Sequence, residues 1–155
     1  MPKKLLIPID FKVESLNTLK YALKGIDEEV EVVLMYSEYL SDSISELLLY
    51  SPDEQRNSLK SGDFREALCI LKNRYESMLV KVDIELFHGY NTNALKNFIE
   101  GHNIDSMYIP KNYKLQPPKN GFDPIPLIVK SKLAYEEVEW QQYADSSSEL
   151  SLLFI

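Results

Sequence analysis

An apolar run that ends on a carboxylate, from Lys4 to Asp10, constrains the fold of this chain more than any other stretch. A run of this kind, followed at once by a helical pattern, is typical of a strand buried in a parallel sheet. Ligands of open α/β sheets bind beyond the carboxyl ends of such strands. We therefore expect a parallel sheet whose ligand-binding edge carries Asp10.

Four later segments also have the composition of strands. They are residues 30–36, 82–87, 105–109 and 124–130. The last one is predicted at an edge of the sheet, because Pro124 and Pro126 at its start have no backbone amide hydrogen to donate. Residues 133–143 fit a helix and a strand about equally well, so both alternatives stay open.

Helical patterns separate these strands, which predicts an α/β fold. Helices are expected after Ser15, at residues 44–50, after Ser51, from Asp63 and from Asn91. The side chain of Ser15 or of Glu14 is expected to cap the first of them. In the helix from Asp63, the acids Asp63 and Glu66 predict a capping box. Between residues 110 and 123, the prolines and the lack of helical spacing predict that the fourth helix is shortened or missing.

Length and charge exclude several classes of protein. The 155 residues fit one domain that can bury a core. The formal net charge of -7 opposes binding to nucleic acid and to anionic membranes, so neither partner is expected. No stretch has the roughly 20 apolar residues of a membrane-spanning helix. With one cysteine, Cys69, and no signal-peptide pattern, we expect a cytoplasmic protein.

Residues that could perform catalysis are few and scattered. His88 and His102 lie in no cluster spaced for a metal, and we expect each at a strand or helix end, bonded to a carbonyl. Cys69 lies among apolar residues of a predicted helix and should pack there. A phospho-receiver domain needs two acids after the first strand and an aspartate after the third, but here Asp10 stands alone and residues 86–89 contain no aspartate. We therefore predict no catalytic residue, no metal site and no enzyme activity.

The opening of the chain resembles the universal stress protein family. The residues that carry the resemblance there are Pro8, Asp10, Phe11, Ser15, Leu16, Leu19, Tyr21, Ala22 and Leu23. With Gly89, the pair Ile104 and Asp105, and residues 126–129, the similarity covers about residues 3–130 and rests on the order and spacing of these pieces. It implies a flavodoxin-like three-layer sandwich of the adenine nucleotide alpha hydrolase-like kind, with five parallel strands in the order 3-2-1-4-5. Residues 1–130 would form this domain, and residues 131–155 an extension that packs on its own chain or on a partner.

The resemblance breaks down at the phosphate-binding motif. In nucleotide-binding members, spaced glycines after the fourth strand let backbone amides approach the ATP phosphates, and a helix N-terminus faces them. Residues 110–115 supply no glycine here, and Gly121 is followed by Phe122 instead of Ser or Thr. The resemblance therefore implies a divergent member with a degenerate nucleotide site and no required cofactor.

These features predict a non-enzymatic, stress-related or regulatory protein that acts as a homodimer or through a protein partner, without the family's mode of ATP binding. The candidate interface residues are Tyr39, Leu40, Leu47, Tyr50, Pro126, Ile128, Trp140, Leu152 and Phe154. The alternative is a module that senses an adenine nucleotide, ATP or AMP, or another anion through Asp10 and three loop lysines. Its candidate binding residues are Pro8, Ile9, Asp10, Phe11, Tyr36, Pro110, Lys111, Lys114 and Lys119.

Overall fold

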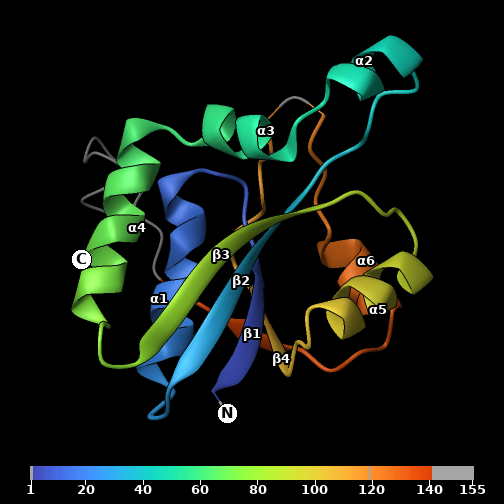
Figure 1. The fold of residues 1–155 in the computed structure, drawn as a ribbon. Helices are drawn as coiled ribbons and strands as arrows, with labels where there is room; N and C mark the ends of the chain where they lie inside the picture. The colour runs from blue at the N-terminus through green and yellow to red at the C-terminus, as the bar shows by residue number, and fades with distance from the viewer. Residues whose placement is uncertain (1, 119, 141–155) are drawn as a thin grey trace.

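Five parallel strands form one sheet in the order β3-β2-β1-β4-β5, which confirms the predicted topology (Figure 1). The computed structural model describes residues 2–118 and 120–140. The strands are β1 (Lys3–Pro8), β2 (Val30–Ser37), β3 (Leu79–Phe87), β4 (Ser106–Pro110) and β5 (Glu136–Val138). This order makes β3 and β5 the edge strands of the described sheet and sets the carboxyl ends of β1 and β4 side by side.

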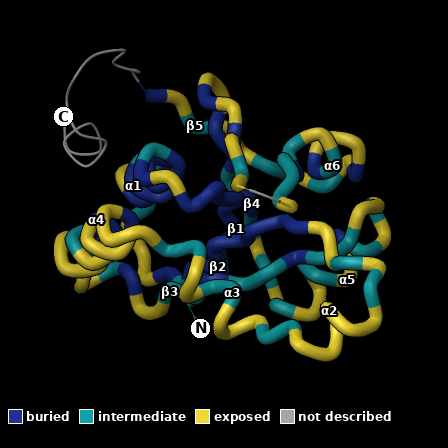
Figure 2. Tube along the Cα trace, turned by 90° about the horizontal axis from the view of Figure 1, so that it is seen from above, coloured by how far each residue is buried: buried dark blue, intermediate teal, exposed yellow. Residues whose placement is uncertain are grey.

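Helices cover both faces of the sheet and complete three layers (Figures 1 and 2). One face carries α1 (Asn17–Lys24) and α4 (Gly62–Arg74), and the other carries α5 (Thr92–Gly101) and α6 (Ile125–Lys130). A 3-10 helix, η1 (Val13–Leu16), leads from β1 into α1. The three-layer sandwich is therefore the predicted one.

The two faces have separate cores because successive side chains of a strand point to opposite sides of the sheet. Leu5 and Ile7 of β1 belong to the core under α1 and α4, together with the fully buried Phe64. Leu6 belongs to the core under α5 and α6, together with Ile128. The continuous apolar run at residues 5–9 is thus needed because β1 is buried on both faces.

The start of α1 differs from the prediction. Ser15 lies inside η1, and its hydroxyl donates a hydrogen bond to the backbone oxygen of Lys12 (2.8 Å). The N-cap position of α1 is Leu16, which makes no side-chain cap. The predicted cap by Ser15 or Glu14 is therefore wrong, because both residues lie inside η1 and the Ser15 hydroxyl bonds within that 3-10 turn.

A serine, and not a pair of acids, caps α4. The Ser61 hydroxyl accepts a hydrogen bond from the backbone N–H of Phe64 (3.1 Å), and the helix begins at Gly62. The predicted capping box of Asp63 and Glu66 is therefore wrong. Asp63 lies in the first turn instead, where a negative charge interacts favourably with the helix dipole.

Replacing Ser61 by alanine should lower the free energy of unfolding by about 1 kcal/mol, the usual effect of losing an N-cap hydroxyl. Urea denaturation of the two proteins measures it. The Asp63→Ala variant is the matched control and should lose only about 0.3–1 kcal/mol, because it removes a charge near the dipole and no cap. A larger loss in Asp63→Ala than in Ser61→Ala would restore the acidic cap.

The segment predicted as the fifth strand, residues 124–130, is the helix α6, so that prediction is wrong. The Asp123 carboxylate accepts a hydrogen bond from the N–H of Ile125 (2.9 Å), and Pro126 lies in the first turn of the helix. Amides of a first turn have no partner within the helix, so proline costs little there. The prolines that favoured an edge strand mark a helix start instead. This six-residue helix follows residues 110–123, the region in which the sequence predicts a shortened or missing fourth helix.

The fifth strand lies further along, at Glu136–Val138, and pairs with residues 108–110 of β4. Of the two alternatives for residues 133–143, the strand holds for these three residues. Lys132, in the left-handed region with a φ of 63°, turns the chain between α6 and β5. The sheet thus continues past residue 130, and the described part of the extension packs on its own chain.

Residues 38–61 leave the sheet after β2 and form two short helices, as predicted. Ser43 caps α2 (Ile44–Leu49), and Ser51 caps α3 (Pro52–Leu59) by accepting the N–H of Glu54 (3.3 Å). Neither helix has a buried residue, and α2 projects from the body of the protein (Figure 1). Within the part of the chain that the structure describes, every helix is too short or too polar to cross a lipid bilayer.

Candidate functional site

The candidate site is the carboxyl edge of β1 and β4, where Asp10 is 1% exposed. One carboxylate oxygen accepts a hydrogen bond from the N–H of Lys12 (2.9 Å). The other accepts two, from the hydroxyl of Tyr113 (2.6 Å) and from the N–H of Gln116 (2.8 Å). Three donors of its own chain therefore occupy the acid that the sequence predicts for ligand binding.

The loop that follows β4 fills the space beside Asp10. Tyr113 and Leu115 alternate inward from this loop and form a small buried cluster with Trp140. The rings of Tyr113 and Trp140 lie 5.7 Å apart, and the amide of Asn112 contacts the backbone of Trp140. The ammonium group of Lys12 donates a hydrogen bond to the side-chain oxygen of Gln116 (2.7 Å). We call residues 111–116 the plug.

The other wall of the site is Tyr36, which is fully buried. Burial, with the nearby carboxylates of Glu38 and Asp10, raises the pKa of Tyr36, so the phenol stays protonated. Neither its hydroxyl nor that of Ser37 has a hydrogen-bond partner within the described residues. Gly121 lies against this wall, where an added Cβ would come within 2.3 Å of the Tyr36 hydroxyl oxygen. The backbone of residues 120–122 thus approaches Tyr36 as closely as only glycine permits.

The remaining predicted binding residues divide into two groups. Pro8, Ile9 and Phe11 are buried around the end of β1, and the ring of Phe11 contacts Tyr36 at 4.9 Å between centroids. Phe11 has a φ of 64°, which turns the chain so that Asp10 faces the plug. These residues shape the core under the site rather than its surface.

The predicted loop residues line an open pocket on the outer side of the plug. Pro110, Lys111 and Lys114 share this pocket of about 400 Å³ with Tyr113 and Asp123, while Asp10 does not line it. Burial raises the pKa of Asp123, against the lowering effects of the Ile125 amide and of Lys114. Lys119 lies outside the described residues. The structure therefore brings two of the three lysines together but separates them from Asp10.

No residue of the plug is a glycine that would let its backbone approach a phosphate closely. The backbone N–H groups of Lys111 and Gln116 already donate hydrogen bonds, to the backbone oxygen of Val138 (2.8 Å) and to the carboxylate of Asp10 (2.8 Å). Among residues 2–118 and 120–140, no three His, Cys, Asp or Glu side chains form a group that could hold a metal ion. The sequence does not predict that Tyr113, Leu115 and Gln116 of the plug lie at the site. Their only sequence signal is the alternation of apolar and polar residues before two prolines.

A second polar cluster lies next to this edge, at the ends of β2 and β3. Glu38 is 2% exposed and accepts hydrogen bonds from Tyr50 (2.7 Å), His88 (2.9 Å) and Gln55 (2.8 Å). The prediction that His88 bonds a carbonyl is wrong, because the buried carboxylate of Glu38 is its partner. Burial raises the pKa of Glu38, but the hydrogen bonds from His88, Tyr50 and Gln55 outweigh burial and hold it below its usual range. Through these hydrogen bonds, the cluster connects the segment of residues 38–61 to the end of β3.

Replacing Glu38 by glutamine should flatten the acid side of the stability profile. The folded pKa lies below the unfolded value of about 4.3, so the stabilising effect of the carboxylate is complete above that value. It is lost as the pH falls through the folded pKa. Wild type should therefore lose about 1–3 kcal/mol more than Glu38→Gln between neutral pH and acid, measured by urea denaturation across that range. Glu66→Gln, an exposed control on α4, should follow wild type, and equal slopes in Glu38→Gln and wild type would contradict the prediction.

The predicted interface residues also divide. Tyr39, Leu40, Leu47 and Pro126 are exposed, whereas Tyr50 is bonded within the Glu38 cluster. Ile128 and Trp140 are buried inside the chain, so they offer no surface to a partner here. Leu152 and Phe154 lie outside the described residues. Cys69, expected to be packed, is exposed on α4.

No protein-family model matches the chain, and no curated protein matches its sequence. Solved structures do match, at low identity. The universal stress protein UspA from Lactobacillus plantarum has a TM-score of 0.55 and 8% identity, over 90% of this chain and 97% of that one. A universal stress family protein from Burkholderia pseudomallei has a TM-score of 0.51 and 10% identity, over 88% and 95%. One from Arabidopsis thaliana, solved with AMP bound, has a TM-score of 0.50 and 9% identity, over 90% and 93%. The chain has the fold of the universal stress proteins.

Proposed function

We propose that this chain is a non-enzymatic, stress-related or regulatory protein that works through association, and that it does not bind ATP at the edge of β1 and β4. The observation that carries the proposal is the plug. Asp10, the acid at the ligand-binding edge of the fold, is bonded to Tyr113, Gln116 and Lys12 of the same chain. An incoming nucleotide would have to break these bonds and displace the Tyr113 ring before it reached the carboxylate.

The surface proposed for association is the exposed apolar segment around α2. Its residues, which we call the α2 surface, are Tyr39, Leu40, Ile44, Leu47, Leu48 and Leu49, and each is at least 42% exposed. Contiguous apolar surface of this kind marks interaction sites on stable proteins. The occupant that we propose is a second copy, since twofold dimers bring the same patch of both subunits together.

The edge strand β5 is a poorer dimer surface in this chain. It has only three residues, and two of them, Glu136 and Glu137, are exposed acids. Pairing β5 with its twin would bring like charges close together, and charged residues on an edge strand oppose strand pairing. The α2 surface carries the proposal for this reason.

Sedimentation velocity of the wild-type chain, at increasing concentration, tests self-association. The Leu48→Glu variant should shift the dimer towards monomer, because Leu48 is 80% exposed and contributes nothing to the core. The matched control is Val80→Glu, an exposed apolar position on β3 outside the α2 surface, which should leave the mass unchanged. A monomeric wild type at submillimolar concentration would refute the homodimer, and a Leu48→Glu dimer as tight as wild type would refute the surface.

A chain that ends at Trp140 tests the part played by the C-terminal segment with Leu152 and Phe154. Ending the chain at residue 130 would be uninformative, because β5 and Trp140 would be lost. A 1–140 chain that dimerises like wild type assigns the interface to the α2 surface alone. A monomeric 1–140 chain would assign it to the segment beyond Trp140.

The second candidate function is an anion or adenine-nucleotide sensor. The pocket that holds Pro110, Lys111 and Lys114 favours it, and so does the fold shared with a protein solved with AMP bound. Lysine is a competent point charge for phosphate. In this case the plug would open, and the hydroxyls of Tyr36 and Ser37, which have no hydrogen-bond partner among the described residues, would gain a ligand.

Calorimetry with ATP and AMP separates the two functions. Association without nucleotide predicts no saturable heat for wild type. Saturable binding that Asp10→Asn and a Lys111→Gln, Lys114→Gln double variant both weaken would support the sensor and overturn the first proposal at this edge. Lys96→Gln, an exposed lysine on α5, is the charge-matched control.

A further inference from the structure

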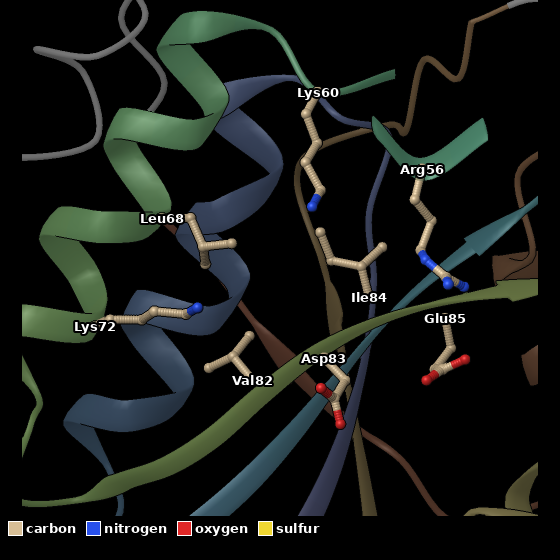
Figure 3. Close-up of a pocket in the computed structure, with 8 residues that line it drawn as sticks. All are labelled: Arg56, Lys60, Leu68, Lys72, Val82, Asp83, Ile84 and Glu85. Atoms are coloured by element: carbon tan, nitrogen blue, oxygen red, sulfur yellow. The ribbon is translucent and has the colours of Figure 1, made fainter. Parts of the chain in front are cut away.

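We infer that a second site, at the free edge of β3 and away from the plug, binds a compact phosphate monoester. The site is a pocket of about 260 Å³ between α3, α4 and β3 (Figure 3). Its lining residues are Arg56, Lys60, Leu68, Lys72, Val82, Asp83, Ile84 and Glu85. It does not share a residue with the proposed nucleotide edge, so the inference stands apart from the proposed function.

Three cations converge on this pocket from two helices. Lys60, the C-cap residue of α3, and Lys72 of α4 extend their ammonium groups towards the space over Val82 and Ile84 (Figure 3). Arg56 of α3 approaches the same space from another side (Figure 3). Asp83 and Glu85 also line the pocket, although their side chains lie on the opposite side of β3, as alternate residues of a strand do (Figure 3). The pocket thus combines a cationic rim and an apolar floor of Val82, Ile84 and Leu68 with two carboxylates on its β3 side.

The positive charge at the rim is only partly neutralised within the described residues. Asp53 pairs with Arg56, and Asp83 pairs with Lys81 (3.3 Å), but Lys60 and Lys72 form no ion pair there. Burial lowers the pKa of Lys60, and the neighbouring cations Arg65, Arg56 and Lys72 lower it further. This concentration of cations occurs in a chain with a net charge of -7. A bound anion would relieve repulsion that the protein itself leaves in place.

The size and lining of the pocket define the class of ligand. Its volume is below the roughly 300–1,000 Å³ of sites for drug-sized molecules, so the ligand is small. Lysine provides a point charge and arginine a planar pair of donors, which together suit the oxygens of a phosphate group. The apolar floor leaves room for a body of a few carbons beside that group. A phosphate monoester with a short carbon chain satisfies both parts of the pocket.

Titration of the wild-type protein with inorganic phosphate and with glycerol phosphate, followed by backbone amide NMR at constant ionic strength, tests the inference. Saturable shifts are expected at residues 60, 72 and 82–85, with glycerol phosphate binding more tightly than phosphate. Glycerol and acetate are the control probes and should give no saturable shift. The double variant Lys60→Gln, Lys72→Gln should weaken binding about tenfold or more, because it removes two charge-assisted contacts. Lys96→Gln should bind as wild type does.

Non-saturating shifts would overturn the inference, and so would saturable shifts confined to Lys111 and Lys114. Equal weakening by Lys96→Gln would also overturn it, because the effect would then be general screening of charge. A measurement on wild type removes any dependence on the folding of the double variant. The pKa of Lys60, followed by carbon NMR, should rise when glycerol phosphate is bound, and an unchanged value would count against the site.

Discussion

Replacing Asp10 by alanine is expected to lower the free energy of unfolding by about 3–5 kcal/mol, because three hydrogen bonds to a buried carboxylate are lost together. The N–H of Lys12, the N–H of Gln116 and the hydroxyl of Tyr113 would all lose their acceptor. Urea denaturation followed by circular dichroism measures the loss.

Two further variants make this prediction specific. Asp10→Asn keeps the shape and one acceptor oxygen, so it should lose less than Asp10→Ala. Asp42→Ala removes an exposed aspartate and should stay within about 0.5 kcal/mol of wild type. A loss below about 1 kcal/mol in Asp10→Ala would mean that the hydrogen bonds to the plug are absent in solution, which would undermine the proposed function as well.

The role of Asp10 changes with its surroundings, not with its position in the fold. Its place after β1 is the place where this fold binds ligands, at the carboxyl ends of parallel strands. Here Tyr113 and Gln116, which lie 103 and 106 residues further along the chain than Asp10, supply donors that a ligand would otherwise offer. The same carboxylate therefore connects the first strand to the loop after the fourth.

The sheet could be predicted because its signals are local. Continuous apolar runs such as 30–36 mark strands buried on both faces, and the helices between them follow the spacing of residues such as Leu95 and Phe98. The fifth strand was misplaced for a local reason too. Prolines occur at the start of edge strands and in the first turn of helices, and only the bond from Ile125 to Asp123 decides between the two.

The candidate site could be predicted only in part, because its geometry depends on contacts distant in sequence. Asp10 and the absence of a glycine-rich motif are visible in the sequence, and they indicate a degenerate site. The plug is not visible, because nothing near Tyr113 indicates that its hydroxyl reaches Asp10. The partner of His88 is hidden for the same reason, since Glu38 lies fifty residues earlier in the chain. The cations of the β3 pocket are likewise spread over α3 and α4.

The second large effect is expected from Trp140→Ala, which should cost about 3–5 kcal/mol of unfolding free energy. Trp140 is 5% exposed and packs between Tyr113 and Tyr21, with ring centroids 5.7 and 6.2 Å away. Its removal leaves a cavity behind the plug that the short strand β5 cannot close. Circular dichroism has to follow the unfolding, because Trp140 is the only tryptophan and its fluorescence disappears with it.

The loss should also be uneven across the molecule, and this separates a clamp on the plug from a general core residue. Hydrogen exchange of the Gln116 amide, which bonds Asp10, should accelerate more than that of Leu6 in β1. Trp140→Phe keeps an aromatic ring against Tyr113 and should restore most of the protection. Equal acceleration of both amides in Trp140→Ala would mean that the plug opens only when the whole domain unfolds. In that case the sensor function would lose its route to Asp10, and association through the α2 surface would be the stronger of the two proposals.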